Sequence, residues 1–162
     1  MTTTLALPAL PLLPVTPKFF DRSNFTIKVY PNSDFAEFII KADTVFDDRA
    51  AEDSKKILEE ARPGKKYFLL VSSSGFFKIT KRARRLGADR LFSSHLAAVA
   101  CYTGNFSLSL LGELYNKLNK PFVITRVFPS REPALEWLMD QMVQSVAPGI
   151  SFAGNMDNIN NI

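Results

Sequence analysis

Two uninterrupted apolar runs constrain the fold of this chain more than any other feature of its sequence. They occupy residues 67–71 and Leu96–Tyr102, and each lies next to segments with helical spacing. A short apolar run without alternation is typical of a strand that is buried on both faces of a sheet. Buried strands that alternate with helices predict an α/β fold with a mixed, mainly parallel central sheet and helices packed on it.

The remaining segments extend this pattern to a predicted element order of ββαβαβαβα. Residues 25–30 alternate between apolar and polar side chains, residues 31–34 form a turn, and residues 37–42 return as the second strand of a hairpin. A last strand is expected at residues 122–128. Helices are expected at residues 47–61, 80–86, 107–118 and from Ser130 onward, each after a suitable capping residue.

The chain is expected to contain one α/β domain, residues 19–146, between an arm and a tail. In the arm, residues 1–18, prolines recur every three residues, which is the period of an extended polyproline helix. The arm has three interpretations: a loose leader, an apolar segment that packs in a groove of its own or a neighbouring subunit, or a ligand for an SH3-like domain. Packing of the arm on a neighbouring subunit would make a homodimer. The tail, residues 147–162, has no core-forming period and is expected to be loose.

The reactive side chains are too few for most catalytic centres. The chain has one cysteine, Cys101, and one histidine, His95, so an intrachain disulfide and a His-rich metal site are excluded. The two residues lie about 20 Å apart along a strand, so they do not form a nucleophile–base pair. Nucleophile-elbow and phosphate-loop motifs do not occur. We therefore expect no enzyme activity, no cofactor and no metal.

Positive charge is concentrated in one short segment. The whole chain carries +4, and residues 78–90 alone hold six basic residues against one acid, Asp89. A local cluster of this kind disfavours binding to nucleic acid, which usually needs a whole basic face. The predicted basic face of the second helix consists of Lys81, Arg82, Arg84 and Arg85. With Phe76 and Phe77 beside it, this face would suit an anionic membrane surface, although a merely solvated helix face is the alternative.

Residues 72–80 form a second candidate site because they follow a central strand. Open α/β sheets bind ligands beyond the carboxyl ends of their strands. Ser74 and Thr80 are candidate phospho-acceptors, and Lys78 and Lys81 would pair with a bound or transferred anion. The alternative is a serine-rich turn followed by a helix cap. No 18-residue apolar stretch occurs, and the single cysteine agrees with a cytoplasmic location.

Three stretches carry a family resemblance over roughly residues 24–143. They read KKYFLLVSSSGFFKITKRAR, LAAVACYTGNFSLSLLGELYNKLNKP and TRVFPSREPALEWL. In residue type and spacing the chain resembles the SpoIIAA-like proteins, which have a STAS-type fold and are compared with CRAL-TRIO-like lipid-binding domains. The resemblance implies a small α/β module, commonly without catalytic function. It also implies membrane association and apolar-ligand binding for some members of this largely uncharacterised branch.

The chain departs from that family at two points. The classical relatives are anti-sigma-factor antagonists that are switched by phosphorylation of a serine at the start of the second helix. Here Ser74 lies in a similar run of residues, but the helix start falls nearer Thr80, so the two registers disagree. Ser72 also stands where relatives of this branch tend to carry an acid.

The sequence and the resemblance together predict a non-catalytic STAS-like binding or regulatory module. The sequence does not identify its protein partner. The alternative is a domain that binds an apolar or lipid-like ligand and associates peripherally with membranes. That alternative predicts a cavity between helices and sheet, lined by Phe76, Phe77, Leu108, Leu111 and Tyr115.

Overall fold

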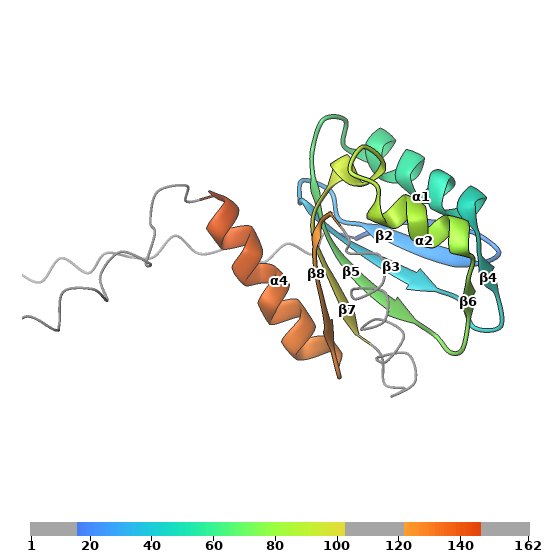
Figure 1. Ribbon diagram of the computed structural model, residues 1–162. Helices are drawn as coiled ribbons and strands as arrows, with labels where there is room; N and C mark the ends of the chain where they lie inside the picture. The colour runs from blue at the N-terminus through green and yellow to red at the C-terminus, as the bar shows by residue number, and fades with distance from the viewer. Residues whose placement is uncertain (1–15, 103–121, 147–162) are drawn as a thin grey trace, which may run out of the picture.

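A six-stranded sheet forms the centre of the protein, as the computed structural model shows for the residues it describes, 16–102 and 122–146 (Figure 1). Its strand order is β1-β2-β3-β5-β7-β8. The strands are β1 (Lys18–Asp21), β2 (Phe25–Val29), β3 (Phe35–Ile40), β5 (Tyr67–Ser73), β7 (Leu96–Tyr102) and β8 (Ile124–Phe128). The first two pairings are antiparallel and the other three are parallel. The predicted mixed, mainly parallel α/β fold is therefore confirmed.

The described helices pack on both faces of this sheet. Helices α1 (Asp48–Ala61) and α2 (Lys81–Ala88) cover one face, and α4 (Arg131–Val146) covers the other (Figure 1). The Asp47 carboxylate accepts a hydrogen bond from Ala50 N at 2.9 Å and so caps α1 where the acidic residues predicted a start. Thr80 caps α2 in the same way, through Ala83 N at 3.2 Å.

Strand β5 lies in the middle of the sheet, and its side chains enter both layers of the core. Tyr67 and Leu69 pack with α1, whereas Phe68 and Leu70 pack with α4. Successive side chains of a strand point to opposite faces, so a strand that is covered on both sides must be apolar at every position. This arrangement explains the uninterrupted apolar run, and burial of each such side chain contributes about 1.5–3 kcal/mol.

Helix α4 is also attached to the sheet by a buried carboxylate. Glu37 of β3 is 6% exposed, and its Oε1 accepts a hydrogen bond from Arg131 Nη2 at 2.6 Å. The Tyr30 hydroxyl donates to the same oxygen at 3.2 Å, and Lys28 Nζ lies 4.0 Å from Oε2. Arg131, Tyr30 and Lys28 therefore compensate the negative charge of Glu37, whose burial without partners would cost free energy.

Several predicted boundaries were wrong, and several short elements were not predicted. Strand β3 begins two residues before the expected position, and β8 begins two residues after it. Strand β1 was not predicted; it begins at Lys18, the last residue of the expected arm. The two-residue strands β4 (Val45–Phe46) and β6 (Lys78–Ile79) and the 3-10 helix η1 (Phe92–His95) are too short for a period to reveal. The expected helix at 107–118 and the tail at 147–162 lie outside the described residues, as do residues 1–15 of the arm.

No helix in the described ranges is long and apolar enough to cross a membrane.

Candidate functional site: an apolar cavity under two helices

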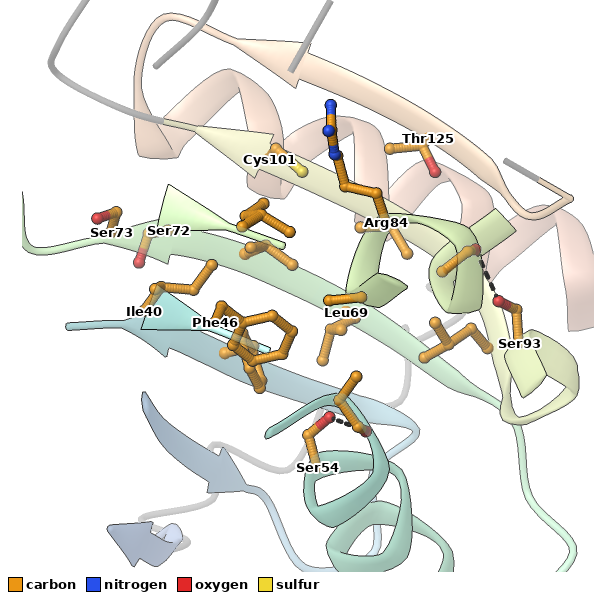
Figure 2. A pocket seen from close by; sticks show the side chains of 18 of the residues that line it. Ile40, Phe46, Ser54, Leu69, Ser72, Ser73, Arg84, Ser93, Cys101 and Thr125 are labelled. Carbon is orange, nitrogen blue, oxygen red and sulfur yellow. Dashed lines mark hydrogen bonds between the residues drawn. The ribbon is translucent and has the colours of Figure 1, made fainter. Parts of the chain in front are cut away.

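A cavity of about 610 Å³ lies between the sheet and the helices α1 and α2 (Figure 2). The sheet side of its wall comes from the four neighbouring strands β3, β5, β7 and β8, and the helix side comes mainly from α1 and α2. Sheet residues in the wall include Phe38, Ile40, Leu69, Val71, Val99, Cys101, Thr125 and Val127. Helix residues in the wall are Ala51, Ser54, Leu58, Ala83, Arg84 and Gly87. The wall is therefore mainly apolar.

Small side chains on the two helices explain why this layer is open. Ala83 and Gly87 are four residues apart and lie on the same side of α2, toward the cavity. Ala51 and Ser54, which are three residues apart, do the same on α1. Such positions hold too little volume to fill the space between a helix and a sheet, whereas an ordinary core leaves few voids larger than a water molecule.

The loop between β5 and β6 closes one end of the cavity, and η1 closes the other. Figure 2 shows Ser72 and Ser73 at the first end and Ser93 at the second. Gly75 permits a close approach of this loop to the end of β3, because a Cβ there would lie 2.7 Å from Ala42 Cβ. The Ser74 hydroxyl holds the same contact by accepting a hydrogen bond from Ala42 N at 2.8 Å.

Three hydroxyl groups in the wall donate their hydrogen bonds to the backbone. Ser54 Oγ donates to Ala51 O at 2.7 Å, and Ser93 Oγ donates to Gly87 O at 2.9 Å. Thr125 Oγ1 donates to Val123 O at 2.9 Å. These three hydroxyl donors are already satisfied within the fold.

The two side chains with catalytic potential are both held neutral. Burial lowers the pKa of His95, although a hydrogen bond between its Nδ1 and Phe92 O at 3.0 Å opposes that shift. Burial raises the pKa of the Cys101 thiol to about 12. A neutral thiol is a poor nucleophile, so the cysteine behaves as a small apolar residue. In the described part of the chain, no group of three histidine, cysteine or acidic residues could hold a metal ion.

Arg84 differs from Ser54, Ser93 and Thr125. Its Nε is enclosed, and it has no hydrogen-bond partner among the residues that the structure describes. In Figure 2 the side chain runs from α2 toward Cys101 and Thr125, which belong to β7 and β8. The predicted basic face is therefore wrong for Arg84. A helix turns about 100° per residue, so a side chain next to Ala83 and three residues before Gly87 is directed inward.

The other three residues of the predicted basic face are exposed. They are Lys81, Arg82 and Arg85. Arg82 Nε lies 3.4 Å from Asp48 Oδ2, so one acid at the start of α1 already has a cationic partner.

The other predicted site residues fall into three groups. Phe76 and Phe77 line the cavity, whereas Leu108, Leu111 and Tyr115 lie outside the described residues. Ser74 supports the loop, and Thr80 caps α2, so both candidate phospho-acceptors have structural roles. Lys78 and Lys81 are exposed on either side of Thr80, and Lys78 also lines the cavity.

Sequence reasoning missed the small-residue positions on the helices and the inward direction of Arg84. One signal was present, because Ala83 and Gly87 are spaced by one helical turn and flank the arginine. That spacing identifies the side of α2 that approaches the sheet.

The protein is thus a small α/β domain in which the layer between the sheet and the helices α1 and α2 contains an apolar cavity with positively charged side chains in its wall. The chain belongs to the family described as "Domain of unknown function (DUF7793)", whose model matches residues 33–142. No curated protein matches the chain. It is similar to the crystal structure of an uncharacterised DUF3478-family protein from Shewanella loihica PV-4, which is described as having a SpoIIAA-like fold. The TM-score is 0.46 at 14% sequence identity, over 76% of this chain and 92% of that one.

Proposed function

We propose that this domain binds an apolar or lipid-like ligand in the cavity between α1, α2 and the sheet. The observation that carries this proposal is the cavity itself, about 610 Å³ with a mainly apolar wall. Pockets for small molecules have volumes of about 300–1,000 Å³ and are lined mostly by apolar side chains. A space of this size far exceeds the ~15 Å³ that a single buried water needs. A ligand would recover the contacts that the open layer lacks.

The chemistry of the wall favours binding over catalysis. His95 ends η1 just before β7, whereas Cys101 lies near the other end of β7, and both are neutral near pH 7. The hydroxyls of Ser54, Ser93 and Thr125 donate to carbonyl oxygens rather than to a base. Acyl transfer and acid–base catalysis need a nucleophile with a base in reach, and these contacts do not supply one. The proposal is therefore of a non-catalytic binding module.

Peripheral association with an anionic membrane is the second function that an observation favours. At the β4–β6 end of the cavity, three apolar side chains are exposed: Val45 by 50%, Phe76 by 55% and Ile79 by 37%. Lys78 and Lys81 are exposed beside them. Each cation near an anionic bilayer contributes about 1 kcal/mol, and exposed apolar side chains add insertion into the headgroup region. Such contact would bring the cavity to a source of lipid.

A neutral probe tests the cavity without reference to charge. N-phenyl-1-naphthylamine fluoresces in apolar surroundings, so its emission should rise when it binds to the full-length protein. Ala83→Leu places a larger side chain in the cavity wall and should weaken probe binding by about tenfold while leaving the melting temperature unchanged or higher. The matched control is Ala88→Leu on the same helix, at a position outside the wall, which should bind as the natural protein does.

Two results would count against the proposal. The first is no rise in emission with the natural protein. The second is equal binding by the Ala83→Leu and Ala88→Leu variants, which would place the probe elsewhere. Native mass spectrometry of protein purified from cells supplies an independent measurement, because a bound lipid adds a defined mass that the Ala83→Leu variant should retain less.

A further inference from the structure

We infer that the ligand is a single-chain amphiphile with a carboxylate head group, and that the Arg84 guanidinium binds this head group. The inference rests on the proposed function, since it names the class of molecule that the cavity takes. Three observations support it: the positive charge of the cavity wall, the Nε donor of Arg84, which has no partner among the described residues, and the direction of the Arg84 side chain.

The described residues of the cavity wall include cations but no acid. Arg84 and Lys78 contribute positive charge, and aspartate and glutamate are missing from the described part of the wall. Asp48, an acid at the start of the neighbouring helix, is 3.4 Å from Arg82 and is therefore already paired. His95 and Cys101 add no charge near neutral pH. The cavity is thus apolar and electropositive, which suits an apolar molecule that carries a negative charge.

Arg84 differs from the hydroxyl groups described above because its Nε is enclosed and has no hydrogen-bond partner among the described residues. Ser54, Ser93 and Thr125 all donate to backbone carbonyls, but Arg84 Nε is enclosed without a partner in residues 16–102 and 122–146. An enclosed donor of a charged group is unfavourable unless an acceptor reaches it. A ligand that brings an acceptor into the cavity removes this cost, so the site selects for one.

A carboxylate is the head group that matches this donor. The guanidinium is planar, and its Nε–H and Nη–H groups lie parallel, so a carboxylate accepts two hydrogen bonds side by side. A neutral hydroxyl has a single oxygen, so it does not match two parallel donors as a carboxylate does, and it leaves the positive charge uncompensated. The head group would lie near β7 and β8, toward which Arg84 extends, and the chain would lie along Leu69, Ile40 and Phe46 (Figure 2).

The experiment compares two displacers that differ only in the head group. Dodecanoate and dodecanol each compete with N-phenyl-1-naphthylamine for the full-length protein at pH 7.5. Dodecanoate should displace the probe at about a tenfold lower concentration than dodecanol, because a charge-assisted pair exceeds a neutral hydrogen bond by at least that factor. Arg84→Gln should remove most of this preference while changing the dodecanol result less than about threefold.

Arg85→Gln is the matched control, because it removes the same charge from the same helix at an exposed position outside the cavity wall. It should keep the preference for dodecanoate. Thermal unfolding monitors folding, and Arg84→Gln should unfold at the same or a higher temperature because it removes an enclosed donor that has no partner among the described residues.

Three outcomes would contradict this inference in whole or in part. Equal displacement by dodecanoate and dodecanol in the natural protein overturns the carboxylate assignment and leaves the apolar cavity standing. A preference that Arg84→Gln retains, or that Arg85→Gln also loses, overturns the role of Arg84. No binding of the neutral probe overturns the proposed function, and this inference with it.

Discussion

The hydroxyl of Tyr67 offers a direct test of the packing around β5. Tyr67 is 0% exposed, and its Oη is enclosed without a hydrogen-bond partner in the part of the chain that the structure describes. Burial of an unsatisfied polar group costs about 1–3 kcal/mol, whereas the aromatic ring contributes its full share to the core. Tyr67→Phe removes the hydroxyl and keeps the ring, so it should stabilise the fold.

The expected gain is about 1–2 kcal/mol, because some of the cost is recovered when neighbouring atoms relax. In a chain of this length, 1 kcal/mol corresponds to about 2–4 °C in the melting temperature. Urea unfolding followed by circular dichroism measures the free energy, and the fluorescence of Trp137, the single tryptophan, gives a second probe of the same transition. The two probes should agree.

Tyr30→Phe is the matched control, and its effect should have the opposite sign. The Tyr30 hydroxyl donates to Glu37 Oε1 at 3.2 Å, so its removal takes a partner from a buried carboxylate and should cost about 0.5–1.5 kcal/mol. If Tyr67→Phe lowers the free energy of unfolding, or both variants lower it equally, then the Tyr67 hydroxyl has a partner and the reasoning is wrong.

Three further predictions concern the cavity end, the opposite layer and the exposed rim. Burial lowers the pKa of His95, so the unfolded chain binds a proton at this histidine more readily than the folded protein does. The free energy of unfolding should therefore fall as the pH drops from about 6.5 through the pKa of His95 in the folded protein. Urea unfolding of His95→Gln should show a shallower fall. Leu138 of α4 is 0% exposed, so Leu138→Ala should cost about 2–5 kcal/mol in the same assay, and a cost below about 1 kcal/mol would contradict the burial. Phe76→Ser should weaken co-sedimentation with phosphatidylserine vesicles at an unchanged melting temperature, whereas Leu91→Ser, which removes a side chain that is 79% exposed, should not.

A helix or strand could be predicted where the local pattern of residues has a single physical explanation. The run at residues 67–71 could only be satisfied by burial on both faces, and Asp47 and Thr80 cap the helices that begin after them. Strand boundaries were less predictable because they depend on the partner strand. β3 begins at Phe35 because its pairing with Phe68 of β5 begins there, and the sequence of β3 alone does not specify that register.

The candidate site could be predicted only in part, for a similar reason. The basic segment and the aromatic pair Phe76 and Phe77 are visible in the sequence, but the side of the helix that Arg84 occupies depends on how α2 meets the sheet. The spacing of Ala83 and Gly87 indicates the side of α2 that approaches the sheet, but it does not specify whether the adjacent Arg84 is directed toward the sheet or toward solvent. The cavity itself depends on the side-chain volumes of nine described elements that are distant in sequence, and no local pattern predicts it.

The two faces of the sheet explain why binding is expected on one of them. Under α4, the layer is closed by large side chains such as Leu138, Trp137 and Phe128, and the Trp137 and Phe128 rings have centroids 5.8 Å apart. Under α1 and α2 the helix positions that face the sheet include alanine, serine and glycine. The closed layer under α4 contributes to the stability of the fold. This stability allows the layer under α1 and α2 to remain open, although the open layer costs free energy. Filling the open layer should therefore raise stability and reduce binding, whereas the same kind of substitution under α4 should only introduce strain.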